Sequence, residues 1–242
     1  MTEAFEISGI PSAGGVLIVV DHASSHVPDD IDLGISPQYR EDHIAFDPGI
    51  APIARLMTEK SGYLAVLSTN SRLIVDLNRY PDEAAVIVER SDGVEIPGNH
   101  LSAEDRQARL DRFFTPYHDR VAALIADLKP ALVASLHSFS PTLRSNPQLE
   151  RPWDMGIMYN EYQTASRMAL QFLGEEAELR VGDQQPYSGK DLNATMNRQC
   201  EAIGQPYIGV EVRQDLIRTE AGQRHFADIL LRSCDKIRTA LA

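Results

Sequence analysis

Three predicted strands each deliver a side chain that could coordinate a metal or move a proton. The candidates are His22 after Val16–Val20, His137 after Ala131–Leu136, and Glu211 within Tyr207–Val212. The carboxyl ends of parallel strands gather at one edge of a sheet, so we expect these side chains to meet there. Imidazole and carboxylate groups that converge from separate elements are the ligand types of a catalytic zinc site. The pattern therefore indicates metal-assisted hydrolysis, with one carboxylate free to move a proton.

Each of these residues also has a purely structural interpretation. A histidine after a strand is often a hydrogen-bonded structural residue, and Glu211 could pair with Arg213 on the same face of its strand. Asp47 precedes Pro48-Gly49 at the start of a predicted helix. From this spacing alone, a carboxylate that caps the helix is the favoured interpretation.

The segment Ser71–Arg79 is rich in charge for so acidic a chain, with the sequence SRLIVDLNR. Because the arginine fork pairs with carboxylates through two parallel hydrogen bonds, one interpretation is a binding site for an acidic substrate. The other is internal ion pairing, of Asp76 with Arg79 or of Arg72 with a glutamate. The residues alone leave both open.

Short apolar runs alternate with longer amphipathic runs along the chain. The predicted strands are 16–20, 64–67, 73–77, 131–136, 155–158 and 207–212, and the predicted helices are 48–60, 102–128 with an interruption near Pro116, 163–173, 193–203 and 220–241. This alternation predicts an α/β fold: a single three-layer αβα domain over residues 1–242, with a mostly parallel mixed sheet covered on both faces.

Composition and the lengths of the apolar runs argue against some classes of binding partner and indicate a cellular location. With 23 Lys and Arg against 35 Asp and Glu, the net charge is −12, which argues against nucleic acid as a partner. The longest apolar run, Val16–Val20, is too short to span a membrane. The N-terminus is acidic and lacks the features of a signal peptide, and the two cysteines are isolated. These features predict a cytoplasmic protein without a membrane partner; they carry no information on oligomeric state.

Other catalytic motifs are missing from the sequence. Gly14-Gly15 precedes a strand instead of following one, so it does not match a dinucleotide or phosphate-binding loop. There is no Gly-x-Ser-x-Gly motif, and Ser138 beside His137 does not by itself indicate a serine hydrolase.

Five short motifs occur in a characteristic order. They are VDHASSHVP (20–28), HIAFDPG (43–49), SRLIVDLNR (71–79), LHSF (136–139) and VEVRQD (210–215). Together they resemble the N-formylglutamate amidohydrolase family over most of the chain. The resemblance implies a phosphorylase/hydrolase-like α/β fold, distantly similar to zinc carboxypeptidases. It also implies hydrolysis of a small N-acyl (N-formyl) amino acid, with Zn²⁺ or another divalent metal as cofactor.

The resemblance also assigns roles by position. It gives His22, Asp47 and His137 as metal ligands, Glu211 as the base that activates water and then protonates the leaving amine, Arg72 as a catalytic residue that binds substrate or stabilises the oxyanion, and Asn78, Arg79, Ser138 and Arg213 as substrate-binding residues. The turn Tyr187–Gly189 and Thr195 are expected to add to the pocket.

One departure from the family pattern affects substrate choice. A histidine is expected in the helix after Thr195, where this chain has Asn197-Arg198-Gln199. The identity of the acyl group therefore stays open. The alternatives are an N-acyl amino-acid deacylase or carboxypeptidase-like hydrolase of different substrate, and a non-catalytic small-molecule binding protein.

Overall fold

Seven strands form one mixed sheet in the computed structural model, which describes residues 4–242, in the order β1-β3-β2-β6-β9-β7-β8. They are β1 (Phe5–Gly9), β2 (Val16–Val20), β3 (Tyr63–Ser68), β6 (Leu132–Phe139), β7 (Met155–Met158), β8 (Val181–Asp183) and β9 (Tyr207–Arg213). Four neighbouring pairs are parallel, whereas β1 and β7 run antiparallel to β3 and β9. The predicted mostly parallel mixed sheet is therefore confirmed.

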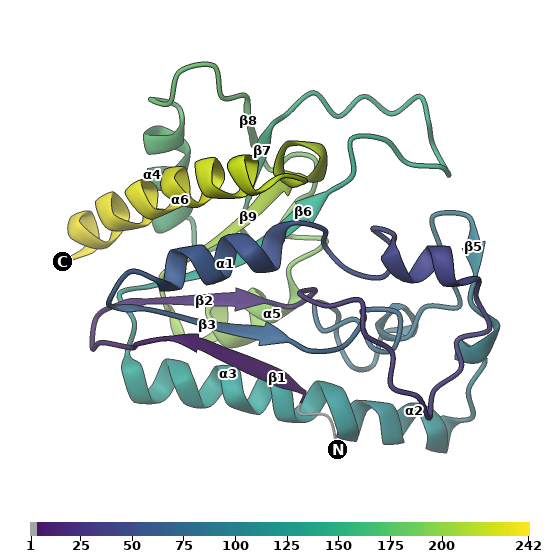
Figure 1. The fold of residues 1–242 in the computed structure, drawn as a ribbon. Coiled ribbons are helices and arrows are strands. Elements are labelled where there is room, and N and C mark those ends of the chain that lie inside the picture. Colours follow the sequence, from purple (N-terminus) through teal and green to yellow (C-terminus); the bar gives the residue numbers. More distant parts are fainter. Residues whose placement is uncertain (1–3) are drawn as a thin grey trace.

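Helices cover both faces of this sheet, with α1 and α6 on one face and α3 on the other (Figure 1). They are α1 (Ile50–Thr58), α2 (Ala103–Arg109), α3 (Thr115–Leu128), α4 (Thr164–Leu173), α5 (Ala194–Gln199) and α6 (Glu220–Leu241). Alternate residues of β2 face the two layers: Ile18 packs with the α1 and α6 side, and Leu17 and Val19 pack with the α3 side. The three-layer arrangement is confirmed.

The long helical region before β6 is interrupted near Pro116, as predicted. The Ser102 hydroxyl caps α2 by accepting a hydrogen bond from the Asp105 N–H at 3.1 Å. Residues Leu110–Phe114 then form wide π-helical turns, and Pro116 lies in the first turn of α3. Proline has no N–H to donate to the preceding turn, so it is tolerated at the start of a helix but not inside one.

The predicted strand at 73–77 is wrong. Its apolar side chains are buried, but its backbone forms turns. Its carbonyl oxygens accept hydrogen bonds from side chains: Leu73 from Asn99 (2.8 Å), Ile74 from Arg109 (3.4 Å) and Leu77 from His118 (3.0 Å). A buried apolar run satisfies its backbone groups equally well in this way, so apolarity alone does not distinguish it from a strand.

Several smaller elements were not predicted from the sequence. These are the edge strands β1 and β8 and a short hairpin of β4 (Arg90–Ser91) and β5 (Val94–Glu95). Strand β6 continues to Phe139, so His137 lies on the strand and not after it. Among residues 4–242, no helix is both long and apolar enough to cross a membrane. Residues 1–3, part of the segment that predicted the cellular location, lie outside the described residues.

Candidate active site

A cavity of about 180 Å³ collects most of the predicted functional residues. Its lining consists of His22, His43, Asp47, Arg72, Asn78, Arg79, His137, Ser138, Phe139, Ser140, Tyr187, Leu192 and Glu211. His22, His137 and Glu211 follow or lie within β2, β6 and β9, neighbours at the centre of the sheet, and the other segments of the lining follow β2, β3, β6 and β8. This is the edge at which the sequence placed the site.

Two histidines and one aspartate meet in this cavity. The His22 and His137 rings lie with their centroids 5.0 Å apart. Asp47 Oδ2 lies 3.4 Å from His22 Nδ1 and 3.0 Å from His137 Nδ1. One ligand atom from each of the three residues lies within 4.8 Å of the other two, and all three residues are buried. The structure therefore brings together the three residues predicted as metal ligands.

Asp47 reaches this cluster because it does not cap the following helix. The N-cap residue of α1 is Gly49, which adopts a left-handed conformation with φ 84°. The Asp47 carboxylate turns toward the cavity, where Oδ2 accepts a hydrogen bond from the Ser138 N–H at 3.2 Å. Its own N–H donates to the His22 carbonyl at 2.9 Å, which fixes the two segments together. The capping interpretation is therefore wrong.

Charge at the cluster favours a bound cation. Burial and the nearby Arg72 oppose the protonated form of His22, but the carboxylates of Asp76 and Asp47 outweigh them and raise its pKa to about 9. Burial likewise opposes the protonated form of His137, and Asp47 raises its pKa above the usual value. In the opposite sense, the two imidazoles outweigh burial and hold the pKa of Asp47 well below its usual range. Surroundings that stabilise a proton on an imidazole also stabilise a metal ion in its place.

Glu211 projects beside His137 from the adjacent strand. The two residues are register partners in the parallel pair β6 and β9, so their side chains emerge on the same face. Glu211 is 5% exposed, and its Oε2 atom is buried without a hydrogen-bond partner among the described residues. Burial raises the pKa of its carboxyl to about 7, with His137 acting in the opposite direction and Asp47 in the same one. A carboxyl with a pKa near 7 is suited to accept and release a proton at neutral pH.

A glycine beside Glu211 allows the turn that carries Tyr187 to approach. Gly156 on β7 is the antiparallel register partner of Glu211. A Cβ at this position would lie 1.9 Å from the Gln185 carbonyl oxygen, so only glycine allows the backbone to pass there. Tyr187 lines the cavity next to this contact, and the Arg151 guanidinium stacks 4.7 Å from its ring centroid. The expectation that this turn adds to the pocket is confirmed.

The two arginines of the segment 71–79 differ in how many of their N–H donors already have a hydrogen-bond acceptor. Arg72 donates to Asp76 Oδ2 from Nε (3.2 Å) and Nη2 (2.7 Å) and to Asp47 Oδ1 from Nη1 (3.3 Å). Arg79 also lines the cavity, but within residues 4–242 its guanidinium forms no ion pair or hydrogen bond. Both keep positive charge at the cavity wall, and Arg79 has the donors free to bind a carboxylate.

Three other predicted substrate-binding residues have different surroundings. Asn78 lines the cavity, and its Oδ1 accepts a hydrogen bond from the Thr195 N–H at 3.1 Å. Ser138 also lines the cavity, but its hydroxyl donates to the Pro48 carbonyl at 3.0 Å. Arg213 does not line the cavity; its guanidinium forms ion pairs with Asp154 at 3.2 Å and Asp215 at 2.8 Å.

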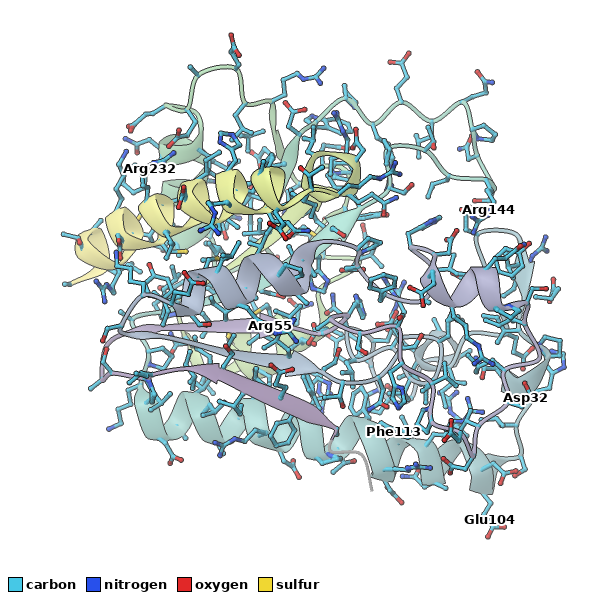
Figure 2. The ribbon with its side chains drawn as sticks, in the orientation of Figure 1. Asp32, Arg55, Glu104, Phe113, Arg144 and Arg232 are labelled. Carbon is cyan, nitrogen blue, oxygen red and sulfur yellow. The ribbon has the colours of Figure 1, made fainter. Side chains whose placement is uncertain are left out.

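One wall of the cavity is a histidine held by two carboxylates. His43 Nδ1 lies 2.7 Å from Asp42 and Nε2 lies 3.1 Å from Asp92. Arg144 pairs with Asp42 at 2.8 Å and lies on the long loop after β6, beside the β4–β5 hairpin (Figure 2). Both ring nitrogens of His43 lie within ion-pair distance of a carboxylate, so we interpret it as a wall of the cavity. The sequence places it in a motif but indicates no role for it.

Sequence reasoning missed two residues that contact the histidines from behind. Asp76 Oδ1 lies 2.7 Å from His22 Nε2, and Ser135 Oγ lies 3.1 Å from His137 Nε2. Ser135 could have been found, because residues two apart on a strand share a face. Asp76 was expected only in an ion pair with Arg79, whereas its arginine partner is Arg72.

The donor set fits a divalent metal. Two imidazole nitrogens and one carboxylate oxygen are ligands that zinc uses in catalytic sites, where a fourth position serves water or substrate. His22 Nδ1 is buried without a hydrogen-bond partner in the described chain, although it faces Asp47. A buried polar atom of this kind needs a partner, and a cation in the cluster would supply it. We conclude that the residues present could hold such an ion.

Comparison with known families agrees with this geometry. A sequence model of the N-formylglutamate amidohydrolase family matches residues 14–218. The chain belongs to this family. An activity of the amidohydrolase class, which breaks C–N bonds other than peptide bonds, follows from membership. A comparison with curated proteins found no match.

Two solved structures are similar to this chain over almost their whole length. The gene product Atu2144 from Agrobacterium tumefaciens shares 30% sequence identity with a TM-score of 0.91, covering 99% of this chain and 96% of that one. An N-formylglutamate amidohydrolase from Ralstonia eutropha JMP134 shares 17% identity with a TM-score of 0.79, covering 99% of this chain and 100% of that one. The similarity to the Ralstonia eutropha protein establishes the fold, which is the hydrolase fold that the motifs implied.

Proposed function

We propose that this amidohydrolase cleaves the amide bond of a small N-acyl amino acid such as N-formylglutamate, with Zn²⁺ or another divalent metal as cofactor. The observation that carries the proposal is one cavity that holds both the cluster of His22, Asp47 and His137 and the separate carboxylate of Glu211. Simple binding of a carboxylate would need none of these four groups. Their combination is that of metal-assisted hydrolysis with a general base.

The size and charge of the cavity support a small acidic substrate. At about 180 Å³ the cavity is smaller than the ~300–1,000 Å³ typical of sites for drug-sized ligands. Arg79 presents a guanidinium that has no hydrogen-bond or ion-pair partner in the described part of the chain, and Asn78 precedes it in the same cavity lining. We assign these two residues to the substrate carboxylate, because the arginine fork binds a carboxylate through two parallel hydrogen bonds. Arg213 is paired elsewhere, and we leave it out of this assignment.

The chain's own groups account for binding and proton transfer. A divalent cation, when bound, would supply Lewis-acid charge that polarises the amide carbonyl and acidifies water. Glu211 takes the proton from the attacking water and returns it to the leaving amine nitrogen as the C–N bond breaks. Arg72 keeps positive charge beside the reacting carbonyl, where it stabilises the developing oxyanion, while it orients Asp47.

A substrate panel tests the proposal and separates it from the deacylase alternative. Purified protein, loaded with zinc, is assayed for release of the free amine from N-formyl-L-glutamate, N-formyl-L-aspartate, N-acetyl-L-glutamate and N-formyl-L-glutamate α-amide. We expect turnover of the formyl amino acids and a large loss when the α-carboxylate is blocked. Preference for the acetyl compound would favour the deacylase alternative. No turnover of any N-acyl amino acid, by protein that has bound zinc, would contradict the proposal.

A further inference from the structure

Asp76 is a buried carboxylate that lies behind the cavity and contacts three residues of its lining, His22, Arg72 and Asn78. It is 3% exposed and is absent from the cavity lining. It accepts four hydrogen bonds: from His22 Nε2 (2.7 Å), Arg72 Nε (3.2 Å), Arg72 Nη2 (2.7 Å) and the Asn78 N–H (3.0 Å). Asp76 forms an ion pair with Arg72 at 2.7 Å, in which the carboxylate is the ionised partner.

The contact with Asp76 determines which nitrogen of His22 faces the cavity. An ionised carboxylate can only accept hydrogen bonds, so His22 Nε2 must carry the proton in this contact. In a neutral imidazole the lone pair then lies on Nδ1. Nδ1 is the atom that faces Asp47 at 3.4 Å and has no hydrogen-bond partner in the described chain. Asp76 thereby selects the tautomer and the ring orientation that a metal ligand requires.

The second histidine of the cluster lacks an equally strong contact. His137 Nε2 lies 3.1 Å from the Ser135 hydroxyl and 3.5 Å from Asn78 Nδ2, both uncharged groups. On this side Asp21 Oδ2 lies 3.7 Å away, beyond hydrogen-bond distance. His137 is held by its place on β6, whereas His22 lies just beyond the end of β2. Of the two histidines, only His22, which lies outside a strand, has a carboxylate within hydrogen-bond distance of its Nε2 among residues 4–242.

Asp76 also connects the histidine to the segment that would bind substrate. Its Oδ1 accepts from both the His22 ring and the Asn78 N–H, and its Oδ2 holds the Arg72 guanidinium. We propose that Asp76 is a positioning residue, which holds the His22 ring for the metal and at the same time fixes the segment 76–79 for the substrate carboxylate. This inference rests on the proposed metal-dependent function.

Zinc affinity of the protein tests this inference without an activity assay. The zinc dissociation constant is measured by competition with a chelator for the wild type, Asp76→Asn and Asp76→Glu. We expect Asp76→Asn to weaken zinc binding by about 10–100-fold, the usual effect of removing a group that orients a metal ligand. Asp76→Glu, which keeps the carboxylate, should recover at least part of the loss. The wild type should also show a proton on His22 Nε2 in the ¹⁵N–¹H spectrum of the zinc-loaded protein.

Asp154→Asn is the matched control variant. Asp154 is a buried carboxylate that accepts hydrogen bonds from the Arg180 guanidinium and the Arg180 N–H, but it contacts neither histidine. Its replacement should leave zinc affinity unchanged.

The outcomes of these measurements distinguish failure of the Asp76 inference from failure of the proposed function. An equal loss of zinc affinity in Asp154→Asn and Asp76→Asn would overturn the inference, as would wild-type affinity in Asp76→Asn. If Asp76→Asn does not fold, the spectrum of the wild type decides: a proton on His22 Nδ1, with Nε2 unprotonated, overturns the inference. A wild type that binds no zinc would instead refute the proposed function, and the inference with it.

Discussion

Replacement of Glu211 by glutamine should lower activity and raise stability at the same time. Glutamine has nearly the same shape as glutamate but cannot accept the proton of the attacking water. Glu211 is buried, its Oε2 has no hydrogen-bond partner in the described chain, and burial raises its carboxyl pKa to about 7. The substitution therefore removes a proton acceptor and an uncompensated buried charge in one step.

The two effects have different sizes and opposite signs. Loss of a general base lowers kcat by roughly 10²–10⁴-fold. For stability, the folded-state pKa of about 7 lies above the ordinary value of 4.5, so ionisation of Glu211 opposes folding. The stability that the protonated form contributes is present below pH 4.5 and is lost as the pH rises through 7. At pH 8 the difference amounts to about 3 kcal/mol, which the glutamine variant should regain in the metal-free protein.

The assay combines turnover with unfolding of the metal-free protein. Initial rates with N-formyl-L-glutamate are measured for zinc-loaded wild type and Glu211→Gln, and denaturant unfolding is followed at pH 5 and pH 8. Glu95→Gln is the control, since Glu95 lies on the β4–β5 hairpin with its side chain 63% exposed, and it should change neither quantity. Unchanged turnover in Glu211→Gln would refute its role as the base. Loss of turnover together with lower stability at pH 8 would refute the reasoning from burial.

Three further predictions concern other parts of the structure. Burial and the nearby Arg198 lower the pKa of His118 to about 4, so its stabilising contribution is present above the ordinary value of 6.5 and is lost as the pH falls through 4. In His118→Gln the fall in unfolding free energy between pH 7 and pH 4 should be smaller by about 3 kcal/mol, and an unaltered pH dependence would contradict this. Arg79→Ala should lower kcat/KM for N-formyl-L-glutamate about 30-fold, corresponding to about 2 kcal/mol for a charged hydrogen-bonded contact. The loss should be much smaller for the α-amide, and equal losses for both compounds would exclude carboxylate binding by Arg79. Gly156→Ala should lower Tm and activity together, because its Cβ would lie 1.9 Å from the Gln185 carbonyl; a wild-type melting curve would show that the turn moves freely.

Much of the arrangement around the site follows from patterns within the sequence. Uninterrupted apolar runs marked the central strands, and alternation with amphipathic runs indicated helices on both faces of the sheet. Since parallel strands present their carboxyl ends at one edge, the positions of His22, His137 and Glu211 along the chain are enough to predict that they meet. The structure brings all three into one cavity.

The parts that were missed depend on contacts between distant segments. The hydrogen bond from His22 to Asp76 joins residues 54 positions apart, and no local pattern encodes it. The segment around Asp76 was predicted as a strand because its apolar residues are buried, yet its backbone turns so that Asp76 reaches Arg72. The position of Asp47 directly before Pro48-Gly49 favours a helix cap, because capping carboxylates occur at the start of a helix. Gly49 takes that position, which frees the carboxylate for the site.

The measurement that tests the account most directly is the amount of zinc bound per chain. Wild type and His137→Ala are loaded with zinc, exchanged into metal-free buffer and analysed by inductively coupled plasma mass spectrometry, with circular dichroism to verify that both are folded. We predict one tightly bound zinc ion per wild-type chain and none in His137→Ala, since each histidine of the cluster supplies one ligand atom. A folded wild type that keeps no zinc, or a variant that keeps as much as the wild type, would contradict the account.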